Sequence, residues 1–197
     1  MAAVININCV LRDAIDIVGI IQELGNSGLI VKLVKAYSID NWRWENQQEI
    51  RNYTNINTLL RKQKIIVVNA NLYPFKDFGL YIERNGDKYI YDFWINTEGF
   101  PELDSDIIDL RNKWFFEKLQ NIIMHLLEKN ISTLELLSVG NETAFAYNGD
   151  LADTIQKTAH VFAWMIPQTS ETAFPIKGYE KRTLGGVEVF YRTVQEL

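Results

Sequence analysis

Residues 78–95 read FGLYIERNGDKYIYDFWI and carry the clearest structural signal in the chain. Two runs rich in aromatic and aliphatic residues, 78–83 and 88–95, flank the pair Asn85-Gly86. Such a pair predicts a β-hairpin with a type I′ turn, because that turn needs positive φ at both central residues. Side chains of the second run alternate between the two faces of the expected sheet. One face carries Tyr89, Tyr91, Phe93 and Ile95, and the other carries Ile90, Asp92 and Trp94.

Hydrophobic periodicity on either side of this hairpin predicts the remaining elements. Further strands are expected at residues 4–10, 29–37, 65–68 and 133–139, with a second hairpin over residues 180–194. Helices are expected at residues 12–24, 107–128 and 149–165. Residues 38–64 have only weak helical character, so a loop with a short helix is expected there.

These elements predict the α+β fold class, with a mixed or mainly antiparallel sheet and about three main helices. The strand–helix–strand order at the start of the chain fits split-βαβ units as building blocks. A chain of 197 residues suits one hydrophobic core, since cores split only beyond ~250–300 residues. We therefore expect a single α+β domain over residues 1–197.

The charge balance narrows the classes of partner. Twenty Lys and Arg residues against twenty-five Asp and Glu residues give a formal net charge of −5. Phosphate backbones and anionic membrane surfaces repel a protein of this sign, so neither nucleic acid nor a membrane is expected as the main partner. A basic protein, by contrast, would be attracted and steered toward the chain.

Cysteine usage and the N-terminal sequence point to a compartment. Cys9 is the only cysteine, which excludes a disulfide within the chain and suits a reducing environment. The sequence after Met1 has no basic leader followed by a long apolar stretch, so no signal peptide is expected. No apolar run approaches the ~18 residues of a membrane span. A cytoplasmic location is therefore expected.

The common catalytic and cofactor motifs are missing. The sequence has no glycine-rich phosphate loop, no Cys-x-x-Cys or His-Glu-x-x-His zinc motif and no Gly-x-Ser-x-Gly nucleophile elbow. Two histidines and one cysteine leave few nucleophile–base pairs. We predict no catalytic residue, no metal ligand and no cofactor, and the sequence leans away from an enzyme. Carboxylate or tyrosine chemistry leaves no short signature and stays open.

Trp42 and Trp44, with Tyr37 nearby, form the first candidate contact group. The two indoles stand two residues apart in an asparagine-rich stretch, and on one face if that stretch is extended. Tryptophan is enriched at binding centres because it buries a large area with few rotamers lost. The alternative is that these rings cover the sheet as a lid. The sequence leaves both interpretations open.

An acidic connector forms the second candidate group. No basic residue stands between Lys88 and Arg111, and the acids in this interval after the hairpin are Glu98, Glu102, Asp104, Asp106 and Asp109. The simplest interpretation is helix capping, in which Asp104 or Ser105 caps a helix that begins at Ile107. A surface for a basic partner and a divalent-metal site are the alternatives. The spacing lacks the glycine turn and the distal glutamate of a calcium loop.

Other conspicuous residues have structural interpretations. His125 and His160 are expected as ordinary helix residues at the edge of the core. Cys9 is expected as a small buried hydrophobe. The cluster Arg61-Lys62-Gln63-Lys64 is expected as a solvated helix end. The three remaining tryptophans stand in strongly patterned elements and are expected in the core; they are Trp94, Trp114 and Trp164.

Three functions follow from these observations. The leading hypothesis is a non-catalytic protein-binding module, for example an acidic inhibitor or immunity-type protein for a basic partner. The second is a small-molecule-binding or regulatory domain, with the Trp42/Trp44 stretch closing over a pocket. The third is an enzyme that uses carboxylates or a metal. Exposed tryptophans beside acidic side chains favour the first hypothesis, whereas a deep pocket favours the other two.

Overall fold

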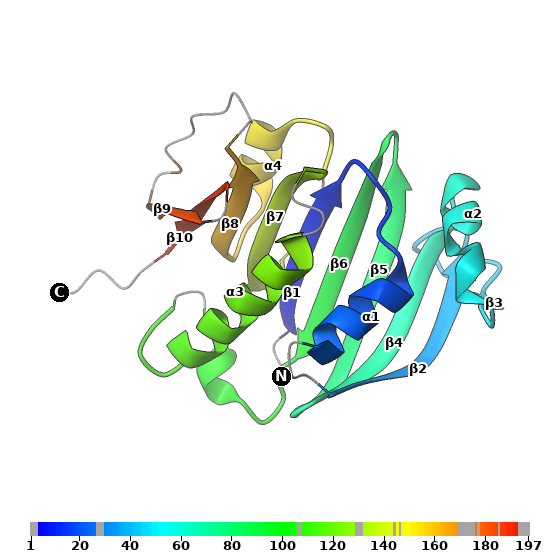
Figure 1. The fold of residues 1–197 in the computed structure, drawn as a ribbon, viewed down its shortest axis with the longest axis horizontal. Coiled ribbons are helices and arrows are strands. Elements are labelled where there is room, and N and C mark those ends of the chain that lie inside the picture. Colours follow the sequence, from blue (N-terminus) through cyan, green and yellow to red (C-terminus); the bar gives the residue numbers. More distant parts are fainter. Residues whose placement is uncertain are drawn as a thin grey trace.

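The structure is a computed structural model that describes residues 4–26, 30–105, 108–128, 132–143, 145, 147–168, 176, 178–184 and 186–192. Within these ranges only the backbone is described at residues 23, 76, 120, 121, 124–128 and 184. A ten-stranded open sheet dominates the fold, in the order β3-β2-β4-β5-β6-β1-β7-β8-β10-β9 (Figure 1). Every described strand pair is antiparallel.

The expected strands and helices are largely present, with longer strands and shorter helices than the sequence predicts. The strands are β1 (Val4–Leu11), β2 (Ile30–Ile39), β3 (Gln48–Glu49), β4 (Ile65–Tyr73), β5 (Phe75–Asn85), β6 (Lys88–Asn96), β7 (Leu134–Asn141), β8 (Val161–Pro167), β9 (Glu180–Leu184) and β10 (Val187–Tyr191). The α-helices are α1 (Ile17–Asn26), α2 (Ile56–Arg61), α3 (Lys113–Glu128) and α4 (Leu151–Lys157). Two short 3₁₀ helices are η1 (Tyr53–Asn55) and η2 (Pro101–Leu103).

The first strand–helix–strand unit is not a split βαβ. Strands β6, β5 and β4 lie between β1 and β2 in the sheet. The four strand pairs from β1 to β2 are all antiparallel, so β1 and β2 point in the same direction. A split βαβ unit leaves space for fewer inserted strands. The chain fills this space by meandering through β4, β5 and β6, so the sheet is antiparallel throughout the described residues.

The β5–β6 hairpin is present, but its turn differs from the expected one. Asn85 pairs with Lys88, so the two loop residues are Gly86 and Asp87 rather than Asn85 and Gly86. In this turn only Gly86 has positive φ, at 64°. A glycine with positive φ at the first loop position is typical of a type II′ turn, which also matches the twist of paired strands.

Helices cover one face of the sheet, which we call the helix face (Figure 1). Helix α1 contributes Ile17, Ile20 and Leu24 to the main core, and α3 contributes a buried stripe. This stripe consists of Phe115, Phe116, Leu119, Ile122 and Ile123. The spacing places all five on one side of a helix, which confirms the amphipathic pattern of this segment.

The opposite face, which we call the rear face, is covered only in part. Over β1, β7, β8 and β10 a second core packs under Leu151 and Ile155 of α4. Over β2 and β4 a third, small core consists of strand residues alone. Among the described helices, none contributes to this third core. The rear face of β2, β4 and β5 is therefore one part of the sheet that no described helix covers.

Two helix predictions need correction. The helix expected from Ile107 begins at Lys113, and the acid beside its start is Asp109 rather than Asp104. The helix expected at residues 149–165 is shorter and consists of α4. It begins after Asp150, as expected, and ends at Thr158, whose backbone is extended. Residues 161–167 then form β8, and all seven are buried. A continuous apolar run fits a strand buried on both faces as well as a helix, so periodicity cannot separate them.

The three tryptophans that the sequence places in the core differ in their burial. Trp164 on β8 is 1% exposed, which confirms its place in the core. Trp94 is half-buried on the rear face. Trp114 on α3 is 47% exposed, so its prediction as a core residue is wrong. Its neighbours Phe115 and Phe116 occupy the buried side of the helix instead.

Candidate functional site

A loop between β2 and β3 holds the two tryptophans of the first candidate group. Residues 40–47 form a tight hairpin loop in which Asp40 N–H donates to the Glu45 carbonyl. The asparagines organise its backbone, since Asn41 Oδ1 accepts from Arg43 N–H and Asn46 Nδ2 donates to Asp40 Oδ2 at 2.7 Å. The first of these is a side-chain to backbone hydrogen bond, which asparagine commonly supplies in turns, and the second joins two side chains. The asparagine-rich composition of the stretch therefore has a structural explanation.

Trp42 leans from this loop onto the rear face of β5. Its indole Nε1–H donates to Glu83 Oε2 at 3.2 Å, and its ring meets Tyr81 edge-on with centroids 5.3 Å apart. The side chain is still 52% exposed. Trp42 thus combines both sequence-based interpretations, because it partly covers the sheet and leaves half its surface open to a partner.

Trp44 in the same loop is 44% exposed, and its backbone has φ of 61°. A left-handed conformation is unfavourable for a bulky side chain, because its Cβ approaches the carbonyl oxygen. A residue whose side chain is exposed and whose backbone is strained does not help the loop to fold. The exposed part of its side chain is available for a contact.

Replacing Trp44 with glycine is expected to leave the protein as stable as before or to stabilise it by up to about 1 kcal/mol, because glycine adopts positive φ without a steric penalty. Urea denaturation measures this change. The buried Trp164→Ala variant is the contrasting control, with an expected loss of about 3–5 kcal/mol. A loss of that size for Trp44→Gly would show that Trp44 is a packing residue.

A row of paired residues crosses the rear face at right angles to the strands. Tyr37 pairs with Val67, Val67 with Tyr81, and Tyr81 with Asp92. The row continues from Asp92 to Asn8 on β1. Since directly paired residues point to the same face, the Tyr37 of the first candidate group and the carboxylate of Asp92 share one surface.

Asp92 is an acid placed in the middle of this sheet. Asn6 Nδ2 donates to Asp92 Oδ1 at 3.0 Å, and Asn6 Oδ1 accepts from the backbone N–H of Thr143. Burial, followed by repulsion from Glu83, outweighs the Asn6 hydrogen bond and raises the pKa of Asp92 to about 6. The carboxylate is thus held in a position where its charge is poorly solvated.

Trp94 completes the surface beside Asp92. Its ring lies over Gly79 on β5, where an added Cβ would come within 2.1 Å of the indole. The ring also packs against Tyr81 with centroids 6.4 Å apart. Burial, followed by the charge of Asp92, raises the pKa of the Tyr81 phenol. We call Trp42, Tyr81, Glu83, Asp92 and Trp94 the aromatic–acidic face.

The second candidate group lies elsewhere. Glu98 follows β6, Glu102 is on η2, and Asp104 is exposed just after it; Asp106 lies outside the described residues. The distance between the two groups follows from their positions along β6. Trp42 contacts Glu83, and Glu83 pairs with Ile90 on β6. Glu98 stands eight positions after Ile90 in the sequence. At about 3.3 Å per residue the separation is roughly 25 Å. The structure therefore does not bring the tryptophan loop and the acidic connector together.

Sequence reasoning did not select Tyr81, Glu83, Asp92 or Trp94 as site residues. The available signal was Asp92, an acid between Ile90 and Trp94 on one face of a strand with an otherwise apolar pattern. An acid at such a position is unusual, because charged groups are rarely buried without a partner. Its surroundings depend on strand pairing, which local sequence does not supply.

The remaining singled-out residues take structural places. Cys9 is buried, and burial raises the pKa of its thiol to about 12, as expected for a small hydrophobe. His160 stands in the exposed turn before β8, not in a helix. The side chain of His125 lies outside what the structure describes. Arg61 and Lys62 end α2 and are exposed, as expected for a solvated helix end, whereas Lys64 of the same cluster forms an ion pair with Asp40.

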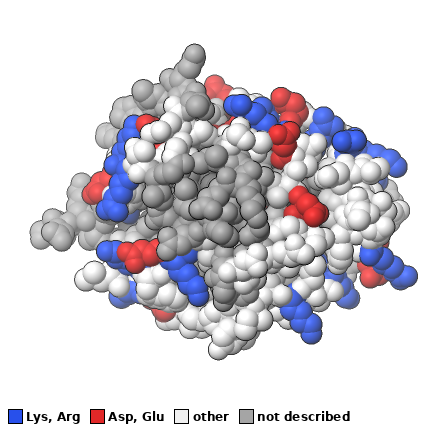
Figure 2. All heavy atoms as spheres, viewed as in Figure 1, with Lys and Arg blue, Asp and Glu red and all other residues white. Residues whose placement is uncertain are grey.

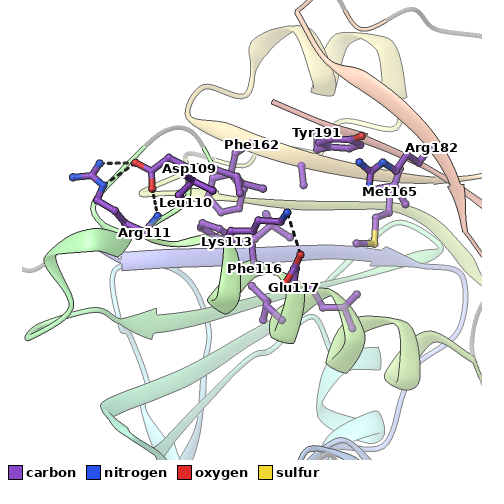
Figure 3. A pocket seen from close by; sticks show the side chains of 16 residues that line it. Asp109, Leu110, Arg111, Lys113, Phe116, Glu117, Phe162, Met165, Arg182 and Tyr191 are labelled. Carbon is purple, nitrogen blue, oxygen red and sulfur yellow. Dashed lines mark hydrogen bonds and ion pairs between the residues drawn. The ribbon is translucent and has the colours of Figure 1, made fainter. Parts of the chain in front are cut away.

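A pocket of about 650 Å³ opens at the other end of the molecule, between α3 and strands β8, β9 and β10 (Figure 3). Its floor is apolar and includes Phe116, Phe162 and Met165. Its rim carries two ion pairs, Arg111 with Asp109 and Lys113 with Glu117. The side chain of Arg182 reaches the rim from β9, beside Tyr191.

Two further features bear on the hypotheses. Among the described residues, no three His, Cys, Asp or Glu side chains come together in a way that could hold a metal ion. None of the described helices is long and apolar enough to cross a membrane.

The chain was compared with known proteins at three levels. No protein-family model, no curated protein and no solved structure matches it. The chemistry of its own residues is therefore what points to a function.

Proposed function

We propose that this protein is a non-catalytic binding module whose aromatic–acidic face receives a cationic side chain, foremost arginine, of a basic protein partner. The observation that carries this proposal is the carboxylate of Asp92, held poorly solvated beside Tyr81 on the rear face of β6, next to the strands β2, β4 and β5 that no described helix covers on this side. Strongly perturbed ionisable groups at a surface are typical of functional sites.

Arginine suits this surface for two physical reasons. Its planar guanidinium stacks on tryptophan and tyrosine rings, and it binds carboxylates through parallel hydrogen bonds. Glu83, already held by the Trp42 indole, and Asp92 together supply two negative charges next to three rings. A cation placed there would restore to Asp92 the stabilisation that burial removes.

The charge of the whole chain supports the same class of partner. A formal net charge of −5 steers a basic protein toward the chain and sets a salt dependence on its association. Trp42 and Trp44, both about half exposed on the adjoining loop, offer additional aromatic contact area. Tyr37, at the end of the same row, extends the surface across β2.

The test is affinity capture from lysate of the source cells at low and high salt, with three forms of the protein as bait. The wild type is expected to retain a basic protein at low salt and to release it at high salt. Glu83→Gln is expected to weaken retention about tenfold or more, because it removes a charged partner of the bound cation. Glu117→Gln on α3, where the side chain is 62% exposed, is the matched control and should retain the protein like the wild type.

Two results would contradict the proposal. One is a retained protein that both glutamine variants hold as strongly as the wild type, which would place the contact elsewhere. The other is the absence of any retained protein under both salt conditions. A retained acidic protein whose binding does not respond to salt would argue against charge-steered association as well.

A further inference from the structure

The pocket beside α3 lies where the helical layer of the helix face ends. Strands β10 and β9 extend the sheet beyond α3, and on the helix face no described helix lies over them (Figure 1). The helix-face side chains of this region, Ala163, Met165 and Val189, form part of the pocket floor. With about 650 Å³ the pocket falls in the size range of small-molecule sites, about 300–1,000 Å³.

The floor and the rim of this pocket differ in chemistry. Phe116 and Phe162 pack edge to face, with centroids 4.3 Å apart, and make one apolar wall with Met165. Leu110 at the rim is 92% exposed, an unusual position for a leucine next to a cavity. An elongated apolar group would find contact along the whole path from the rim to the floor.

Arg182 is the cation at this rim that pairs with no described acid. Its guanidinium stacks on the Tyr191 ring at 4.8 Å, whereas Arg111 and Lys113 are engaged by Asp109 and Glu117. The nearest acid on its own strand, Glu180, accepts a hydrogen bond from the Tyr191 hydroxyl at 3.1 Å. Figure 2 shows both basic and acidic side chains on the side of the molecule where β9, β10 and the start of α3 lie. The guanidinium also makes a side-chain hydrogen bond with Tyr191, and its remaining N–H donors can bind a carboxylate.

We propose that this pocket binds an amphipathic monocarboxylate, such as a medium-chain fatty acid, with its apolar tail on the floor between α3 and β8–β10 and its carboxylate on Arg182. The site is independent of the aromatic–acidic face, which lies on the other side of the sheet. A guanidinium with no acidic partner among the described residues balances one carboxylate, and the apolar floor favours an alkyl chain over a polar one.

Isothermal titration calorimetry with octanoate, decanoate and decan-1-ol tests this assignment. For the wild type, affinity is expected to rise about threefold to fourfold for each methylene added to the alkanoate. Decanoate is expected to bind about tenfold more tightly than decan-1-ol, because a charge-assisted hydrogen bond is lost in the alcohol. The absence of saturable alkanoate binding to the wild type would overturn the proposal.

Variants on β9 separate carboxylate recognition from a general charge effect. Arg182→Gln is expected to weaken decanoate binding about tenfold and to leave decan-1-ol binding unchanged. Lys181→Gln is the control, because it removes the same charge from the neighbouring position. Lys181 points to the rear face, where it pairs with Glu188, so this variant should bind decanoate like the wild type. Equal losses in both variants, or equal affinity of the wild type for the acid and the alcohol, would overturn the role of Arg182. Arg182 is exposed, so this variant is expected to fold normally.

Discussion

Asp92→Asn is expected to make the protein more stable at pH 8 by about 2 kcal/mol, while leaving its stability at pH 4 nearly unchanged. The reason is the raised pKa of Asp92, which shifts from its ordinary value of 3.8 to about 6. Each pKa unit corresponds to about 1.4 kcal/mol, and residual solvent contact reduces the full effect. An asparagine can still accept the hydrogen bond that Asn6 donates.

The sign of this effect follows from proton linkage. Below pH 3.8 the carboxyl is protonated in both folded and unfolded chains, so the stability that protonated Asp92 supports is fully present. As the pH rises through about 6, the folded protein must ionise a buried group and this stability is lost. The wild type should therefore lose stability between pH 4 and pH 8, and Asp92→Asn should lose less.

Urea denaturation across this pH range gives the measurement. Asp77→Asn on β5, where the aspartate is exposed, is the matched control and should follow the wild type. The same Asp92→Asn variant is expected to bind the basic partner more weakly, so that stability and binding change in opposite directions. Identical pH dependence of wild type and Asp92→Asn would contradict the burial argument.

Gly79→Ala is expected to destabilise the protein by about 1–3 kcal/mol, because the added methyl group overpacks the rear face. Its Cβ would lie 2.1 Å from the Trp94 ring, which no real contact allows, so the indole must move. Gly25→Ala in α1 is the control, since no atom lies within 4 Å of its Cβ. Alanine there should leave stability unchanged or raise it by about 0.5–1 kcal/mol.

A double-mutant cycle identifies the cause of the Gly79→Ala loss. With Trp94→Leu in the background, the methyl group has space and its cost should fall by about 1 kcal/mol or more. Urea denaturation of the four proteins gives this coupling, and a red shift of tryptophan emission in Gly79→Ala would report the displaced indole. An unchanged cost in the Trp94→Leu background would show that the ring does not limit residue 79.

The sequence predicts the elements whose local signals agree with their tertiary place. Both hairpins follow from alternating side chains around glycine-containing turns, and the buried stripe of α3 follows from its spacing. The β5–β6 turn is displaced by one residue from Asn85-Gly86 to Gly86-Asp87, since strand pairing decides which glycine-containing turn closes. Local sequence alone does not fix the position of a turn to a single residue.

The candidate site is harder to predict because it is built across strands. Trp42 and Tyr37 stand out in the sequence, yet their partners come from β4 and β5, and Asp92 comes from β6. Asp92 acquires its raised pKa only through burial in the completed sheet. The failed prediction for residues 149–165 has a related origin, since β8 is apolar along its whole length and is buried by segments distant in sequence.

An open sheet of ten strands also exposes two edges, where unpaired backbone groups invite another chain to add a strand. At one edge β3 pairs only with Tyr37 and Ser38, so most of β2 is left without a described neighbour on that side. There β2 carries Lys32 and Lys35, and its register shifts between Leu33 and Lys35. Lysines and bulges are devices by which natural sheets discourage edge-to-edge aggregation.

The opposite edge uses charge for the same purpose. Strand β9 places Glu180, Lys181 and Arg182 in succession, all exposed. A second copy aligned there would have to bring these charges into a new interface and desolvate them. The sheet can thus remain open without polymerising through its own edges.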